Sequence, residues 1–334
     1  MIAKEIQVCF TTDDCYVRYT AVTMASILFN AGDNDRFHFH ILSIQLSSKN
    51  KSKLKKLKKI RNCGISFYDI NESELDIFKK INSIPHLVAS AYIRLFIPLL
   101  LNDYDKVIYL DSDLLIQKNL ASIANVDIGD YWIGGVEDIN HTYWAAQLQL
   151  KDTKYINTGV LVINCKACRE NSYYKKMESI VNLNFKKYRI ADQDVINDAF
   201  YDNITYISNR YNVHWYHHAM YKKGLSKPSD PDDFYAACNE PVVVHFPGIW
   251  KPWSPSKEIH AYRDAYEHYL SMTAWAPIIP WKLTRKLKYF IRTVRTPNLK
   301  QTYFGGLIIK KVERKNGNIV KSFLGIKYCK KIVK

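Results

Sequence analysis

A short apolar stretch that ends in two acids constrains this chain most. Residues 106–116 read Lys-Val-Ile-Tyr-Leu-Asp-Ser-Asp-Leu-Leu-Ile, a β-prone run broken by Asp111 and Asp113. Because the side chains of an extended chain alternate between its two faces, both carboxylates point the same way. Two unpaired carboxylates repel each other, and Mg²⁺ or Mn²⁺ relieves that repulsion while also binding phosphate oxygens. The pair therefore indicates a divalent-cation site, and the alternative is two acids in an ordinary turn after a strand.

Size and composition are those of a globular protein. A chain of 334 residues can bury a substantial core, and 47% apolar with 24% charged residues is typical of folded domains. No apolar run approaches the roughly 20 residues that cross a bilayer, and residues 1–6 lack the apolar core of a signal peptide. The seven cysteines are scattered and odd in number, as expected of reduced thiols. These features predict a cytoplasmic protein.

The net charge of +16 is concentrated at the C-terminus. Residues 281–334 contain 16 Lys and Arg against one acid, whereas residues 1–280 contain 32 basic and 31 acidic groups. Such a tail is attracted to anionic surfaces, either lipid headgroups or nucleic acid. Residues 282–294 alternate basic and apolar side chains at helical spacing, which predicts an amphipathic helix on an anionic membrane. The Asn316-Gly317 pair between two strand-like runs predicts a β-hairpin.

Strand-like and helix-like segments alternate through the first 280 residues. That alternation predicts an α/β domain with a nucleotide-binding turn after the first strand. Neither G-x-G-x-x-G nor a P-loop is present, so a nucleotide would be held in another way. The expected strands are residues 5–10, 37–44, 65–70, 106–110, 131–136, 160–164 and 242–244. The expected helices are residues 17–31, 47–61, 72–80, 87–100, 119–126, 166–185, 258–272 and one that starts at 191.

Several polar residues stand out within these elements. Arg94 lies in an apolar helix, and because a buried guanidinium needs an anion, its partner is either structural or a substrate carboxylate or phosphate. Asp192 and Asp194 fall in the first turn of a helix, where acids commonly cap it. His245 ends a buried strand and is of the commonest metal-ligand type, and the turn after it, with a Gly and a Lys, suits phosphate contact. The aromatic residues of 211–218 suit either sugar stacking or a core.

Six separated segments stand in the order found in one known family, and they are residues 10–16, 92–95, 109–113, 157–164, 192–194 and 245–253. Together they resemble the bacterial lipopolysaccharide galactosyl- and glucosyltransferases of glycosyltransferase family 8. The resemblance implies an α/β fold, a single Rossmann-like domain of the GT-A type with a mixed central sheet. We expect this catalytic domain in residues 1–273 and a basic, membrane-associating extension in residues 274–334.

The resemblance also implies how a UDP-sugar would be bound. Asp111, Asp113 and His245 match the ligands of a Mn²⁺ or Mg²⁺ ion that bridges both phosphates. Tyr16 is expected to stack on uracil and Asp13 to accept a hydrogen bond from its ring N–H, and Cys15 replaces an Asn often found in this turn. Gly248 and Lys251 are expected to hold the diphosphate, with Lys251 helping to neutralise the leaving UDP, and Ser112 to touch the ribose or diphosphate. Arg94 and Asn157 are expected to bind donor-sugar hydroxyls, and Thr11 and Asp14 to bind elsewhere in the UDP-sugar site.

The reaction implied by the resemblance retains the anomeric configuration. Retaining glycosidases use a carboxylate nucleophile, but the matching residue here is Gln193, whose amide is a poor nucleophile. We therefore expect same-face attack, in which the acceptor hydroxyl lies beside the departing phosphate and that phosphate serves as base. Asp138 and Asp192 are expected to bind donor-sugar hydroxyls, Asp192 and Asp194 are candidates for stabilising an oxocarbenium-like centre, and His86 is expected nearby.

The expected function is transfer of glucose or galactose from UDP-glucose or UDP-galactose to a cell-surface glycan such as lipopolysaccharide core, by an enzyme peripheral on the cytoplasmic membrane face. One alternative is a haloacid-dehalogenase-type phosphohydrolase, which also needs Mg²⁺ at a D-x-D. Its motif continues with Thr or Val where Leu115 stands here. The other alternative is a nucleic-acid-binding protein that uses the basic tail. The rest of the chain offers it no basic face or known module, so no nucleic-acid partner is expected.

Overall fold

The computed structural model describes residues 5–81, 89–225, 227–254 and 260–277, and five strands within residues 291–330. The chain divides into two compact units, Met1–Ala276 and Pro277–Lys334. Among the residues described, no helix has both the length and the apolar character of a membrane span.

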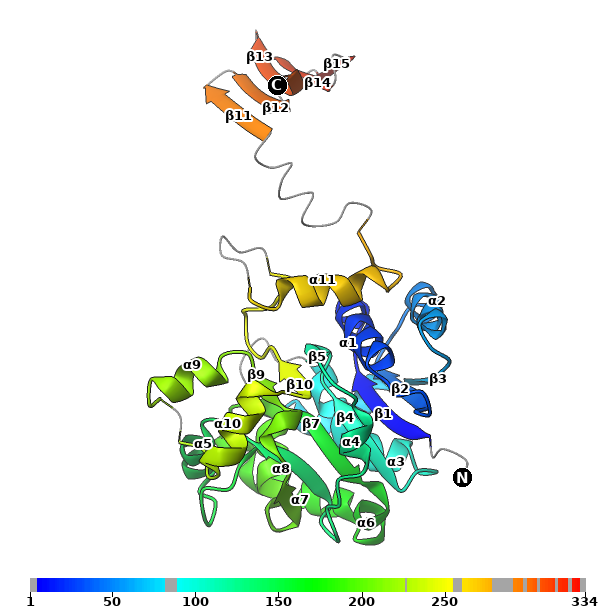
Figure 1. The fold of residues 1–334 in the computed structure, drawn as a ribbon, viewed down its shortest axis with the longest axis vertical. Coiled ribbons are helices and arrows are strands. Elements are labelled where there is room, and N and C mark those ends of the chain that lie inside the picture. The colour runs from blue at the N-terminus through cyan, green and yellow to red at the C-terminus, as the bar shows by residue number, and fades with distance from the viewer. Residues whose placement is uncertain are drawn as a thin grey trace. The chain divides into compact units, whose positions relative to one another are not determined.

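A seven-stranded sheet forms the centre of the first unit (Figure 1). The strand order is β3 (Gly64–Asp69), β2 (Phe37–Ser43), β1 (Ile6–Thr11), β4 (Lys106–Leu110), β7 (Ile156–Asn164), β6 (Ile133–Glu137) and β8 (Ile204–Tyr206). Strands β1, β2, β3 and β4 are mutually parallel, β7 is antiparallel to its neighbours β4 and β6, and β8 is parallel to β6. The mixed α/β sheet expected from the sequence is therefore confirmed.

The reversed direction of β7 brings three strand ends to one edge of the sheet. Leu110, the last residue of β4, pairs with Val160 of β7. Glu137, the last residue of β6, pairs with Ile156, the first residue of β7. The residues that follow β4 and β6 therefore lie near the start of β7, and this edge carries Asp111, Asp138 and Asn157.

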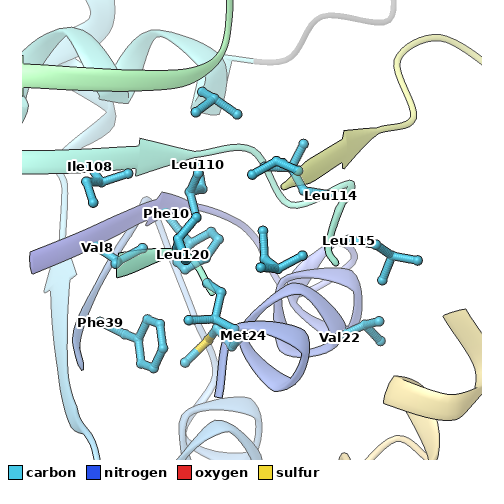
Figure 2. Packing of buried hydrophobic residues seen from close by; sticks show 14 of the residues in the cluster. Val8, Phe10, Val22, Met24, Phe39, Ile108, Leu110, Leu114, Leu115 and Leu120 are labelled. Atoms are coloured by element: carbon cyan, nitrogen blue, oxygen red, sulfur yellow. The ribbon is translucent and has the colours of Figure 1, made fainter. Parts of the chain in front are cut away.

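Both faces of the sheet are buried, as alternating side chains of β1 show. Val8 and Phe10 belong to one apolar cluster, which includes Met24 of helix α1 (Val17–Phe29) (Figure 2). Cys9, between them in sequence, belongs to a second cluster that also contains Tyr109. Continuous burial on both faces explains why these strands read as near-continuous apolar runs.

The helices divide between the two clusters. Helices α1 (Val17–Phe29), α2 (Ser48–Lys55) and α11 (Arg263–Ser271) supply side chains to the first cluster. Helices α3 (Ile97–Leu100), α6 (Cys165–Glu170), α7 (Tyr173–Asn184) and α8 (Ala191–Ala199) supply the second. The other helices are α4 (Ala121–Ala124), α5 (His141–Leu148), α9 (His217–Lys222), α10 (Pro231–Asn239) and the 3₁₀ helices η1 (Lys56–Lys59), η2 (Glu72–Phe78), η3 (Ala89–Phe96), η4 (Phe185–Lys187), η5 (Tyr201–Asn203) and η6 (Asn209–Tyr211).

Several predicted helices differ from those observed. The described parts of the helices expected over residues 47–61, 72–80 and 87–100 are wholly or partly 3₁₀ helix, namely η1, η2 and η3. A single helix over residues 166–185 is wrong, because Ser172 between α6 and α7 has φ of 51°, a left-handed conformation that interrupts a right-handed helix. Helix α11 begins at Arg263 instead of residue 258, and residues 255–259 lie outside the described part. No sequence pattern predicted the short elements α5, α9, α10, β8 and β9 (Val213–His214).

A small second sheet joins distant parts of the first unit. It consists of β5 (Leu114–Ile116), β10 (Val243–His245) and β9 (Val213–His214). His245 pairs with Leu114 on one side and with His214 on the other. The end of β10 is thereby held next to Asp113, the residue before β5.

The second unit is a five-stranded antiparallel sheet in sequence order. Its strands are β11 (Ile291–Thr296), β12 (Leu299–Phe304), β13 (Leu307–Lys315), β14 (Asn318–Phe323) and β15 (Ile326–Lys330). Lys315 pairs with Asn318 across the Asn316-Gly317 step, which confirms the predicted hairpin. The predicted amphipathic helix is wrong for residues 291–294, which lie in β11, and residues 282–290 lie outside the described part. Three of those four residues, Ile291, Thr293 and Val294, are β-branched, which favours a strand.

Candidate active site

Two acids and an imidazole converge at the edge where β4 ends. Asp111, Asp113 and His245 each offer one ligand atom, and these atoms all lie within 4.8 Å of one another. His245 Nε2 is 3.4 Å from Asp113 Oδ1 and 3.8 Å from Asp111 Oδ2. Two carboxylates and an imidazole form a donor set that Mn²⁺ accepts readily and that Mg²⁺ accepts when phosphate and water complete the shell. The structure thus brings together the three metal ligands expected from the sequence.

Gly159 makes this convergence possible. A Cβ at this position would lie 2.4 Å from His245 Cε1 and 2.8 Å from His245 Nδ1, so a larger residue would displace the ring. The carbonyl oxygen of Gly159 also accepts a hydrogen bond of 2.8 Å from the backbone N–H of Asp111. The glycine that follows Asn157-Thr158 is therefore required by the close approach of the imidazole to β7.

Arg94 finds its anions within the chain. Its guanidinium lies 2.9 Å from Asp111 Oδ1 and 3.0 Å from Asp192 Oδ2, and it donates to the carbonyl of Thr158 at 2.8 Å. Burial alone would lower the pKa of Arg94, but the charges of Asp111 and Asp192 raise it. Of the two partners considered from the sequence, the structural carboxylate is the one observed.

Asp192 is held in a different electrostatic balance. Burial raises the pKa of Asp192 to about 6, with Asp111 adding to the rise and Arg94 opposing it. Its Oδ2 also accepts a hydrogen bond of 3.3 Å from the hydroxyl of Thr158. A carboxyl with a raised pKa beside a fixed cation can stabilise positive charge that develops in a substrate.

Lys251 provides a second internal cation. Its Nζ contacts Asp113 Oδ2 and the carbonyl oxygen of Phe246. Burial would raise the pKa of Asp113, but Lys251 and His245 outweigh burial and lower it. Gly248, in the turn between β10 and Lys251, has φ of 75°, a conformation that favours glycine. The predicted phosphate-binding lysine therefore lies directly at the acid pair.

The turn after β1 carries the residues expected to bind uridine. Asp13 Oδ1 accepts from the backbone N–H groups of Cys15 and Tyr16 at 2.8 and 2.7 Å. Tyr16 is 42% exposed, and burial of the rest, together with the charges of Asp113 and Asp111, raises the pKa of Tyr16 to about 12. A half-exposed ring beside the acid pair is available for stacking.

The other residues expected around the nucleotide mainly hold this loop in place. Asp14 Oδ1 accepts hydrogen bonds of 2.9 Å from Ser47 N and Asn50 Nδ2, which ties the loop to the start of α2. Thr11 Oγ1 lies 3.0 Å from the hydroxyl of Tyr109, and Ser112 Oγ lies 2.8 Å from Thr20 Oγ1.

Gln193 lies at the centre of a second polar group, next to the first. Its Oε1 accepts from Asn157 Nδ2 at 3.1 Å and from Thr158 N at 3.2 Å, and its Nε2 donates to Asp138 Oδ2 at 3.4 Å. Burial raises the pKa of Asp138 against the hydrogen bonds that lower it. The amide is therefore held in one orientation, with its carbonyl oxygen occupied by two donors.

Asp194 makes its contacts outside this group. The carboxylate of Asp194 accepts from the hydroxyl of Tyr155 at 2.6 Å and from the backbone N–H of Ile190 at 2.7 Å. These contacts are those of an acid that caps the first turn of α8, the alternative considered from the sequence. His86 lies outside the described residues.

Asn212 is a site residue that no sequence pattern indicated. Its amide lies between two predicted site residues, with Nδ2 2.8 Å from Asn157 Oδ1 and Oδ1 2.8 Å from His245 Nδ1. It comes from the aromatic-rich stretch before β9, where its polar side chain is 1% exposed. A single Asn in a stretch with few clear periods gives no signal that separates it from a turn residue.

Residues 7–256 match the family model described as Glycosyl transferase family 8, which is more than half of the chain. The chain belongs to glycosyltransferase family 8. Among curated family relatives, general stress protein A of Bacillus subtilis (strain 168) is 27% identical over 274 residues, which are 80% of this chain and 93% of that protein. The lipopolysaccharide 1,2-glucosyltransferase of Escherichia coli is 26% identical over 287 residues, 81% of this chain and 79% of that protein.

Solved structures give the same family assignment. The galactosyltransferase LgtC, in complex with donor and acceptor sugar analogues, superposes with a TM-score of 0.70 at 26% identity, over 84% of this chain and 100% of that chain. The GT-A-type fold implied by the sequence resemblance is thereby confirmed, as is the family itself. Because the chain belongs to family 8, the alternative of a haloacid-dehalogenase-type phosphohydrolase is rejected.

Proposed function

We propose that this glycosyltransferase is a metal-dependent, retaining enzyme that moves glucose or galactose from a UDP-sugar to a hydroxyl of a cell-surface glycan such as lipopolysaccharide core. The observation that carries the proposal is the cluster of Asp111, Asp113 and His245 directly beside the Asp138–Asn157–Gln193 group. A lipopolysaccharide glucosyltransferase among the relatives and a galactosyltransferase with donor and acceptor analogues among the structures support both substrate classes.

The cluster of Asp111, Asp113 and His245 accounts for the departure of UDP. Asp111, Asp113 and His245 would hold Mn²⁺ or Mg²⁺, and such an ion would supply Lewis-acid neutralisation of the diphosphate. Lys251 already contacts Asp113 and can donate to a phosphate oxygen of leaving UDP. Gly248 is exposed in the turn before Lys251. Tyr16 offers its exposed ring to uracil, with the Asp13 turn fixing where that ring stands.

The group formed by Asp138, Asn157 and Gln193 accounts for retention of the anomeric configuration without a carboxylate nucleophile. Gln193 Oε1 already accepts two hydrogen bonds, so it orients its neighbours and attacks nothing. We therefore favour attack by the acceptor hydroxyl on the face that UDP leaves, with a phosphate oxygen taking the proton. In this proposal Asp138 and Asn157 bind donor-sugar hydroxyls. Asp192, which pairs with Arg94, stabilises positive charge that develops at the anomeric carbon.

Incubation with radiolabelled UDP-glucose, UDP-galactose or UDP-N-acetylhexosamines and Mn²⁺ tests this function. Slow, Mn²⁺-dependent release of free hexose and UDP from one hexose donor is expected, and an added glycan acceptor should divert the hexose into product. Release of inorganic phosphate, or no turnover of any UDP-sugar, would reject the proposal.

The second unit is proposed to hold the enzyme at the cytoplasmic membrane face. Its support is the excess of 16 basic residues over one acid in residues 281–334, a density of charge that anionic lipid attracts. Truncation after Ala276, the end of the first unit, should abolish sedimentation with vesicles that contain phosphatidylglycerol and leave UDP-sugar hydrolysis intact. Undiminished sedimentation of the truncated protein would contradict the assignment.

A further inference from the structure

A chain of hydrogen bonds runs from two backbone N–H groups of β7 to the ring of His245. Thr158 N donates to Gln193 Oε1 at 3.2 Å, and Gly159 N donates to Asn157 Oδ1 at 3.0 Å. A backbone N–H can only donate, so each of these contacts identifies an oxygen. The reversed Asn157 amide would place an NH₂ against the N–H of Gly159 and an oxygen against Gln193 Oε1.

The orientation of Asn157 fixes that of Asn212. The oxygen of Asn157 lies 2.8 Å from one end of the Asn212 amide. Because that oxygen can only accept, the end of Asn212 that faces it must be the NH₂ group. The oxygen of Asn212 then faces the opposite way, 2.8 Å from His245 Nδ1. The reversed Asn212 amide would put two acceptor oxygens in contact at this distance.

Asn212 in turn fixes the proton on the imidazole. A carbonyl oxygen only accepts, so His245 Nδ1 must carry the hydrogen. The neutral ring then has its lone pair on Nε2, the atom 3.4 Å from Asp113 and 3.8 Å from Asp111. Asn212 is 1% and His245 3% exposed, so bulk water does not compete for this hydrogen bond. The neighbouring His214 is occupied elsewhere, with Nδ1 3.1 Å from the hydroxyl of Tyr216.

We infer that Asn212 is a positioning residue that holds His245 in the Nδ1–H tautomer and so presents Nε2 as a ready metal ligand. The inference rests on the proposed function for the identity of the ion, while the tautomer itself follows from the hydrogen bonds alone. The same series of hydrogen bonds links His245 to the group formed by Asp138, Asn157 and Gln193, because Asn157 also donates to Gln193 Oε1 at 3.1 Å. Removal of such an outer-shell partner typically weakens metal binding roughly 10- to 100-fold.

Three variants separate this role from a merely structural one. Asn212→Leu keeps the volume and removes both hydrogen bonds, whereas Asn212→Asp keeps an acceptor for His245 Nδ1. Asn197→Leu is the matched control, because Asn197 is also 1% exposed and its amide bonds only to backbone groups, at 2.7 to 2.9 Å. All three should lose stability, but only Asn212→Leu should affect the imidazole.

Two measurements on the full chain decide the matter. The tautomer is read by long-range ¹H–¹⁵N correlation on metal-free, ¹⁵N-histidine-labelled protein, with His245 assigned by its loss in His245→Gln. Mn²⁺ affinity is read by electron paramagnetic resonance of free Mn²⁺, with and without UDP. We expect Nδ1–H in the wild type, in Asn212→Asp and in Asn197→Leu, and a mixed tautomer with roughly 10- to 100-fold weaker Mn²⁺ binding in Asn212→Leu.

The outcomes for this inference and for the proposed function differ. An Nε2–H tautomer in the wild type would overturn the inference, as would unchanged tautomer and affinity in Asn212→Leu. If Asn212→Leu does not fold, loss of the Nδ1–H form in Asn212→Asp would overturn it and its retention would support it. A wild-type protein with the Nδ1–H tautomer and no Mn²⁺ binding would uphold the inference and reject the proposed metal dependence.

Discussion

Replacement of Gly159 by alanine should push His245 out of the cation site. The added Cβ would lie 2.4 Å from Cε1 and 2.8 Å from Nδ1 of the ring, whereas ordinary contact begins at 3.4 Å. The ring must therefore retreat by about 1 Å, which is enough to break the 2.8 Å hydrogen bond to Asn212. Overpacking of this kind costs about 1–3 kcal/mol, and the displaced Nε2 should weaken Mn²⁺ binding roughly 10- to 100-fold.

The assay for Gly159→Ala pairs urea denaturation with Mn²⁺ titration. Gly134→Ala is the matched control, because its Cβ would lie 2.7 Å from the side chain of Ile128 and 3.0 Å from that of Ile207. It should lose similar stability and keep its Mn²⁺ affinity. In a His245→Ala background, Gly159→Ala should cost little, since the clashing ring is gone. Wild-type Mn²⁺ affinity in Gly159→Ala, or an equal loss in both glycine variants, would refute the steric account.

Further changes should each act on one feature of the structure. Asp113→Asn should reduce Mn²⁺-dependent UDP release to background without changing the circular dichroism spectrum; full activity would reject Asp113 as a ligand. Arg94→Met leaves two carboxylates without their cation and should lower the free energy of unfolding by about 3–5 kcal/mol in urea, whereas the exposed Arg36→Met should change it by less than about 0.5 kcal/mol; equal effects would contradict the buried pair. Burial and the nearby His38 lower the pKa of His40 to about 3. The pKa of this histidine in the unfolded chain is near 6.5. The unfolded chain therefore binds a proton that folded His40 does not, and the free energy of unfolding falls by up to about 4 kcal/mol as the pH drops from 6.5 toward 3. Urea titrations from pH 7 to 4 should therefore show a shallower decline for His40→Gln, and an unchanged slope would argue against this source of acid sensitivity.

Local patterns predicted the elements that place the acid pair. The apolar run of β4 ended at Asp111 as expected, and both acids lie close to His245, but Ser112 and Asp113 form a bend instead of the extended chain from which their common face was predicted. His245 was recognised as the last residue of a buried strand, but its pairing with Leu114 was not predictable from pattern, because β5 and β10 have three residues each. Pairing of such short strands is decided by tertiary contacts across more than a hundred residues, and no periodicity records it.

Partner choice was likewise beyond the sequence patterns. The apolar surroundings of Arg94 showed that it needed an anion, but its carboxylate partners come from the end of β4 and from α8. Asn212 gave no pattern at all, since its role depends on two neighbours brought to it by the fold. In the tail, helical spacing competed with β-branched composition over residues 291–294, and strand pairing with β12 prevailed.

The two internal cations, Arg94 and Lys251, affect how this enzyme folds and how stable it is without a metal ion. Arg94 neutralises one acid and Lys251 the other, so the newly synthesised polypeptide can close around its catalytic carboxylates without first capturing an ion. Under the proposed metal dependence, a chelator should silence the enzyme reversibly and leave its melting temperature nearly unchanged, in contrast to small zinc domains that unfold when stripped. Activity in the cell would then follow the supply of free divalent metal, without loss of the protein itself.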